Sequence, residues 1–97
     1  MLLIYSNHIN GKLIENDFNL EAHQVLKNLN AVLNQGGSSL QSIVKLTVFL
    51  TDLSFFTQVN EVFENYFPND PPARSVVQIS ALPMNARVEI EAVGFIQ

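Results

Sequence analysis

The sequence predicts one small α+β domain, in which a mixed β-sheet carries two helices on one of its faces. Two segments have the apolar spacing of amphipathic helices, and the segments around them have the apolar, β-branched content of strands. The predicted order is β-(β)-α-β-α-β-β. No linker-like stretch or internal repeat interrupts residues 1–97, and this length suits one domain. Placing both helices on one sheet face buries the apolar sides of all elements together.

The opening of the chain is predicted to be extended. Residues 2–9 have the pattern of a strand, with the even-numbered positions from 2 to 8 on one face. Asn10-Gly11 is a strong turn dipeptide, and residues 12–14 would return as a short strand. We therefore expect a strand followed by a short hairpin return.

The first helix is predicted over residues 20–35. Its start is assigned to Asn19 as the N-cap, and Gly36 is expected to end it in a left-handed conformation. The residues that line its predicted apolar face are Ala22, Val25, Leu26, Leu29, Val32 and Leu33. This spacing of three and four predicts a helix that packs one face on the core.

The second half of the chain alternates between strands and a helix. Residues 42–51 are apolar on nearly both faces, which is typical of a central strand. A second helix follows and ends at Pro68. Its predicted inward residues are Phe56, Val59, Phe63 and either Tyr66 or Phe67. Residues 73–80 and 87–95 are the last two strands, and the second of these should place Arg87, Glu89 and Glu91 on one face.

Composition excludes several classes of function. The chain has 5 basic and 9 acidic side chains, and its cations are scattered singly rather than clustered as nucleic-acid binding requires. It has no Cys, which excludes disulfides and thiolate ligands, and His8 and His23 do not form a metal-site pattern. The longest apolar runs fall far below the roughly 20 residues that span a bilayer. Residues 1–5 lack the features of a signal peptide, so we expect a cytosolic protein.

Three charged residues could carry chemistry. Arg74 begins a strand after a pair of prolines, and its guanidinium offers a rigid fork for a carboxylate or a phosphate. The alternative is a surface salt bridge. Glu89 and Glu91 point to the same face of the last strand, where one could act as a general base or orient a water. The alternative for them is a solvated strand face.

Several motifs resemble one known family. They are VKLTVFL at 44–50, PARS at 72–75, the Leu82-Pro83 pair and VEIEA at 88–92, preceded by a helix that reads VLKNLNAVL at 25–33. At this spacing the chain resembles the reactive intermediate deaminase family, also known as Rid, YjgF-like or endoribonuclease L-PSP. The match covers nearly the whole chain from Leu2, without the usual N-terminal strand of the family.

The resemblance implies a fold, an assembly and a reaction. The fold is the chorismate-mutase-like (YjgF-like) α+β domain, which forms a homotrimer with its pockets between subunits. Charged side chains make up only 14% of the chain, below the usual level of about 25%, and such an assembly would bury the apolar surface left over. The reaction is hydrolysis of enamines and imines, such as 2-aminoacrylate derivatives, to 2-keto acids and ammonia. It needs no metal or organic cofactor.

The resemblance also implies roles for single residues. Arg74 matches the arginine that grips the substrate carboxylate, and Glu89 matches the glutamate that holds or activates the attacking water. Ser6 and Asn7 fall on the pocket-lining segment, and the backbone at Val76 helps to hold the ligand. Asn60 and Glu91 match recurrent positions that we interpret as structural.

One departure from the family pattern supports an alternative function. Ser6-Asn7-His8 stands where the family has Ser-Gly-Gln, so Asn7 replaces a glycine whose backbone approaches the ligand. The alternative is a non-catalytic trimer that binds a small carboxylate and reports it to a partner. RNA cleavage is disfavoured by the acidic charge.

Overall fold

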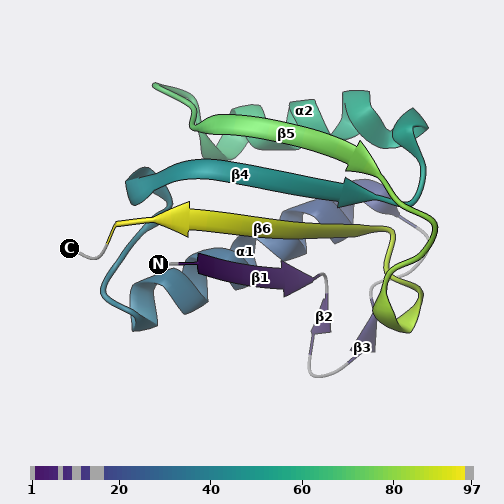
Figure 1. Ribbon diagram of the computed structural model, residues 1–97, viewed down its shortest axis with the longest axis horizontal. Helices are drawn as coiled ribbons and strands as arrows, with labels where there is room; N and C mark the ends of the chain where they lie inside the picture. The colour runs from purple at the N-terminus through teal and green to yellow at the C-terminus, as the bar shows by residue number, and fades with distance from the viewer. Residues whose placement is uncertain (1, 7, 10–11, 14–16, 96–97) are drawn as a thin grey trace.

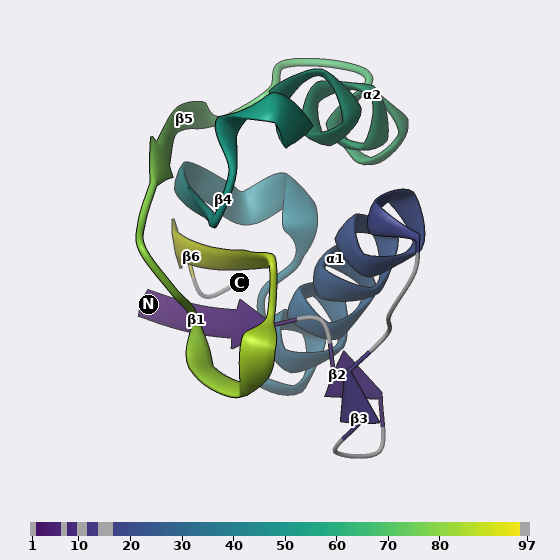
Figure 2. The ribbon, with the colours of Figure 1, turned by 90° about the vertical axis from the view of Figure 1, so that its right-hand side faces the viewer.

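The fold is a four-stranded mixed sheet with two helices packed on one face (Figures 1 and 2). It is described from a computed structural model over residues 2–6, 8–9, 12–13 and 17–95, with side chains from residue 17 onward. The sheet has the order β1-β6-β4-β5, and β6 is antiparallel to both of its neighbours, whereas β5 runs parallel to β4. The elements are β1 (Leu2–Ser6), α1 (Phe18–Gln35), β4 (Ile43–Leu50), α2 (Phe56–Tyr66), β5 (Ala73–Gln78) and β6 (Val88–Gly94). The predicted fold class is confirmed.

The opening segment differs from the prediction of one continuous strand. β1 ends at Ser6, and β2 (His8–Ile9) belongs to a separate two-stranded sheet with β3 (Lys12–Leu13). The predicted return strand is therefore confirmed, although it pairs with β2 and not with the main sheet. The Asn10-Gly11 turn lies outside the described residues.

Helix α1 begins two residues earlier than predicted, its predicted N-cap is wrong, and its C-cap is Gly36 as predicted but without the left-handed conformation. Asp17 is the N-cap, because its Oδ1 accepts the backbone N–H of Leu20 at 3.3 Å, while Asn19 already lies inside the helix. Gly36 has φ −85° because its N–H still bonds to the carbonyl of Val32 at 3.1 Å. The left-handed residue is Gly37, with φ 81°.

Helix α2 places a different phenylalanine inward from the one predicted. Phe56 is 43% exposed. The 3₁₀ turn over Leu53–Phe55 shifts the entry into the helix, so that Phe55 packs against the core and stacks on Phe18 with ring centroids 4.1 Å apart. The buried residues of the helix are Val59, Val62 and Phe63, which still follow the helical period.

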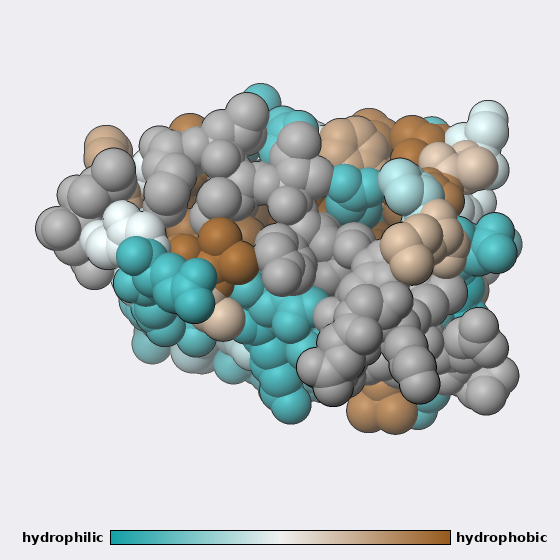
Figure 3. All heavy atoms as spheres, turned by 90° about the horizontal axis from the view of Figure 1, so that it is seen from below, coloured by the Kyte–Doolittle hydropathy of each residue, from teal (hydrophilic) through white to brown (hydrophobic). Residues whose placement is uncertain are grey.

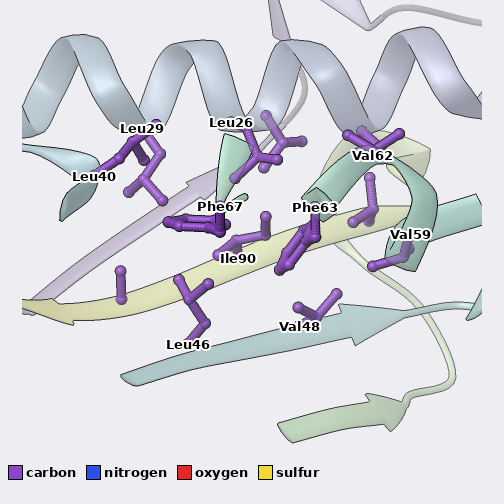
Figure 4. Close-up of a cluster of buried hydrophobic side chains, with 14 of the residues drawn as sticks. Leu26, Leu29, Leu40, Leu46, Val48, Val59, Val62, Phe63, Phe67 and Ile90 are labelled. Carbon is purple, nitrogen blue, oxygen red and sulfur yellow. The ribbon is translucent and has the colours of Figure 1, made fainter. Parts of the chain in front are cut away.

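The core lies between the helices and one face of the sheet (Figure 4). Leu46, Val48 and Leu50 of β4 point toward the helices, and so do the alternate residues of β6. Full burial of each such side chain contributes about 1.5–3 kcal/mol to folding. The three strands predicted over 42–51, 73–80 and 87–95 are all present but shorter at their ends. The opposite face of the sheet has no helix over it in Figure 2.

Neither described helix is long and apolar enough to cross a membrane.

Candidate functional site

Arg74 lies in a cleft between β5 and α2. It pairs in register with Leu46 of β4, which is fully buried beneath the helices, so its side chain points to the helix side of the sheet. β5 is an edge strand, and Arg74 is exposed there with its guanidinium carbon 5.0 Å from the ring centroid of Phe63. The cleft has a volume of about 430 Å³. Its lining residues are Leu46, Asn60, Phe63, Glu64, Phe67, Pro71, Pro72 and Arg74.

No carboxylate pairs with Arg74 among the side chains described over 17–95. Glu64 lines the same cleft without forming an ion pair with it. The surface salt bridge left open by the sequence is therefore not formed within this part of the chain. The planar donors of the guanidinium stay available to an anion from outside, and a carboxylate matches their geometry.

Glu89 lies on the other face of the sheet, near the start of β6. It pairs in register with Ser6 of β1 on one side and with Phe49 of β4 on the other. Glu89 is half-buried, and partial burial raises the pKa of its carboxyl, with a smaller contribution from the negative charge of Glu91. A carboxyl in this state suits transfer of a proton to and from a bound group.

The two candidate residues therefore lie on opposite faces of one sheet. β4 separates β5 from β6, Arg74 points to the helix side, and Glu89 points to the open side. One chain brings Glu89 and Ser6 together in the ladder, and it places Val76 beside Arg74 on the same side of β5. Asn7 lies outside the described residues. A single copy does not bring Arg74 and Glu89 to one point.

Asn60 is a residue whose position in the cleft the sequence did not reveal. The resemblance suggests a structural role for it, and in the structure it lines the Arg74 cleft. Its Oδ1 is buried and has no hydrogen-bond partner among the described residues. A signal was present: Asn60, Phe63 and Glu64 share one helical face, and the β4-α2-β5 crossover turns that face toward β5.

Arg87 does not share the face of Glu89, which corrects the sequence prediction. It lies just before β6 and forms an ion pair with Glu21 of α1, whose side chain is almost fully buried. Its guanidinium also lies beside the stacked rings of Phe18 and Phe55. Arg87 is thereby used to join β6 to α1. Among the described residues, no ion pair neutralises Glu89 or Glu91.

A metal site has no support in the part of the chain where side chains are described. No group of three or more His, Asp or Glu side chains comes close enough there to hold an ion. His23 instead contacts Tyr66 of α2, with its Nδ1 3.3 Å from the tyrosine hydroxyl. The contact joins the two helices, as expected for a residue at the boundary of the core.

Comparison with known proteins gives this geometry a family. The model of the family described as endoribonuclease L-PSP matches residues 4–96. The chain belongs to this family. The motifs at 44–50, 72–75 and 88–92 thus gave the correct assignment.

Relatives with named activities are found within the family. The chain is 43% identical over 84 residues to Reactive Intermediate Deaminase A, chloroplastic, of Arabidopsis thaliana, which covers 87% of this chain and 45% of that protein. It is 42% identical over 84 residues to the human 2-iminobutanoate/2-iminopropanoate deaminase, covering 87% of this chain and 61% of the relative. The chain thus spans less than two thirds of either relative.

A solved structure confirms the fold. Escherichia coli TdcF, determined with bound serine, superposes with a TM-score of 0.87 at 32% identity. The match covers 96% of this chain and 79% of TdcF. The mixed sheet with two helices on one face is therefore shared with Rid structures.

Proposed function

We propose that this protein hydrolyses 2-imino acids and their enamine tautomers, such as 2-aminoacrylate, to 2-keto acids and ammonia. The observation that carries the proposal is Arg74, an exposed guanidinium without an ion-pair partner among the described side chains, in a cleft of about 430 Å³. It fits a substrate that carries a carboxylate. The named deaminase relatives support the choice of reaction.

The proposed chemistry assigns one task to each half of the site. Arg74 holds the substrate carboxylate, which fixes the position of the neighbouring C2 atom. Glu89 takes a proton from water while the water oxygen bonds to C2 of the imine. That proton passes to the nitrogen, which gives a carbinolamine. The proton of its new hydroxyl group then also moves to the nitrogen as the C–N bond breaks, so that ammonia leaves and a 2-keto acid remains. The raised pKa of Glu89 favours such a two-way proton transfer, and no metal or organic cofactor takes part.

The site of the proposal is completed by a second copy of the chain. Arg74 and Glu89 lie on opposite faces of one sheet, so the arginine of one subunit would meet the glutamate and Ser6 of the next. A homotrimer supplies three such junctions by rotation. That assembly could bury apolar side chains that one chain leaves exposed on β5 and β6. They are Val77, which is 39% exposed, and Val93, which is 37% exposed.

Mixing two inactive variants tests both the reaction and the shared site. Arg74→Ala should cost on the order of 2–5 kcal/mol of transition-state binding, because it removes a charged bidentate contact. Glu89→Gln should abolish proton transfer. Refolded together in equal amounts, they should regain about a quarter of wild-type turnover, since each junction draws its arginine and glutamate independently. The readout is release of ammonia from 2-aminoacrylate generated in the cuvette.

A matched mixture serves as the control for this experiment. Arg74→Ala refolded with the double variant Arg74→Ala/Glu89→Gln has no intact arginine and should recover nothing. Full turnover by Arg74→Ala alone would disprove the deaminase proposal. If both single variants are inactive and their mixed oligomers form without regaining turnover, the reaction stands but the shared site is wrong.

A second candidate function is binding of a small carboxylate without turnover. TdcF, the relative determined with bound serine, is a family member that holds an amino acid. The Arg74 cleft of one chain is enough for such binding, whereas catalysis also needs Glu89. Calorimetry with 2-ketobutyrate would support this function if it binds a preparation that releases no ammonia. Loss of turnover and of binding together in Arg74→Ala favours the enzyme.

A further inference from the structure

The turn that joins β5 to β6 has an unfavourable backbone for its sequence. The backbone N–H of Ala86 donates to the carbonyl of Pro83 at 3.2 Å, which closes a four-residue turn that contains the 3₁₀ segment η3 (Pro83–Asn85). Its two central residues are both left-handed, Met84 with φ 58° and Asn85 with φ 60°. Such type I′ turns favour Asn and Gly at these positions. Asn85 tolerates the conformation, but Met84 is strained by it.

The side chain of Met84 gains nothing within the chain to offset this strain. It is 64% exposed, more than any other large apolar residue described except Phe95. Met84 therefore has two costs, a strained backbone and an apolar side chain in solvent. Gly or Asn at this position would remove both. Strained residues of this kind cluster at ligand clamps and active sites.

The position of the turn connects it with the Glu89 half of the site. Figures 1 and 2 both place η3 beside the end of β1, and the last residue of β1, Ser6, pairs with Glu89. Met84 lies in the connection between β5 and β6, five residues before Glu89 of β6. Figure 3 shows the molecule from the β1 side, with the end that holds η3 on the right. This end exposes apolar residues among hydrophilic ones.

We propose that Met84 is a specificity-determining residue, whose side chain covers the apolar side chain of a 2-imino acid bound at the Glu89 half of the site. The inference rests on the deaminase function proposed above. The unbranched thioether of methionine adapts its shape to side chains of different length. The enzyme should therefore favour imines with longer apolar side chains over the shortest one, and Met84 should supply that preference.

Two variants of the same turn separate specificity from folding. Met84→Gly removes the strain together with the side chain, and Asn85→Gly improves the same turn while keeping Met84. Met84→Gly should raise the melting temperature by roughly 4 °C, the size expected for relieving a left-handed residue in a small domain, and Asn85→Gly should raise it less, because Asn already tolerates the conformation. Only Met84→Gly should lower kcat/KM for the imine of leucine, by about tenfold, with at most about a twofold loss for the imine of alanine. An amino-acid oxidase generates both imines.

Rescue and independence complete the test. Met84→Leu should restore the preference for the leucine-derived imine without raising the melting temperature. The inference is wrong if Met84→Gly keeps the wild-type ratio of kcat/KM for the two imines, or if Asn85→Gly changes that ratio equally. In either case Arg74→Ala still reports on the reaction itself, so failure of this inference differs from failure of the deaminase proposal.

Discussion

Two arginines of this chain occupy opposite kinds of environment. Arg87 directs its Nε and Nη2 to the carboxylate of Glu21, and its guanidinium carbon lies 5.5 Å from the ring centroid of Phe55. Arg74 lies over the ring of Phe63, is exposed, and has no ion pair among the described side chains. The partners of each guanidinium, and not the residue type, decide whether it joins elements of the fold or is available to a ligand.

The two environments predict losses of stability of very different size for the same substitution, and the loss at Arg87 is the largest effect expected here. Arg87→Ala leaves the buried carboxylate of Glu21 without this cation and should lower the free energy of unfolding by about 3–5 kcal/mol. Arg74→Ala loses an exposed cation–π contact and should cost no more than about 1 kcal/mol. Urea denaturation of both variants measures the difference.

A double variant shows whether the loss comes from removing the cation beside a buried carboxylate. Replacing both partners, as in Glu21→Met/Arg87→Met, removes the buried charge together with its cation and should recover most of the stability lost in Arg87→Ala. If Arg87→Ala is as stable as Arg74→Ala, the ion pair with Glu21 does not support the fold and the contrast between the two arginines fails.

Glu21 and Glu89 differ in the same way as the two arginines, and here we expect a smaller effect, a shift in the pH dependence of activity. Glu21 faces a cation, whereas the pKa of Glu89 is raised above 4.5, mainly by burial and then by Glu91. Glu91→Gln should lower that pKa without returning it to 4.5, because the burial remains. The acid limb of kcat/KM should then move to lower pH, since Glu89 loses its proton earlier. Glu61→Gln, an exposed change on α2, should leave the limb unmoved.

The raised pKa of Glu89 also makes the stability of the fold depend on pH. Folded protein holds the Glu89 proton more tightly than unfolded protein, so stability falls as pH rises from 4.5 through the raised pKa. Glu91→Gln should make that fall smaller. Denaturation of wild type and Glu91→Gln below and above this pH range measures the fall in unfolding free energy. If neither this fall nor the acid limb of kcat/KM changes in Glu91→Gln, Glu91 does not influence Glu89.

Most of the fold was predictable because it rests on local periodicity. The apolar residues of α1 recur at steps of three and four, and β4 is apolar on both faces because it is a central strand. The misplaced features depend on finer choices. Phe55 and Phe56 are adjacent and equally apolar, and only the 3₁₀ turn before α2 decides which one faces inward.

The candidate site was predictable as a set of residues but not as an arrangement. Arg74 and Glu89 stand out in the sequence, yet their opposite faces follow from the registers of β4 with β5 and β6, which no local pattern specifies. The pairing of Glu21 with Arg87 joins residues 66 positions apart. Strand register and long-range pairing are set by packing of the whole domain. The local pattern alone therefore predicted, wrongly, that Arg87 shares a strand face with Glu89.

The smallest expected effect on stability concerns two polar residues at the start of α1, of which only one has a hydrogen-bond partner among the described residues. Asp17 accepts the N–H of Leu20, while the Oδ1 of Asn19 is buried without a hydrogen-bond partner among the described residues. Asp17→Ala should therefore cost about 1 kcal/mol of unfolding free energy. Asn19→Ala should cost less or stabilise, because it removes a buried polar atom that is not compensated. A larger loss for Asn19→Ala would restore Asn19 as the cap and show that α1 begins where its sequence alone suggested.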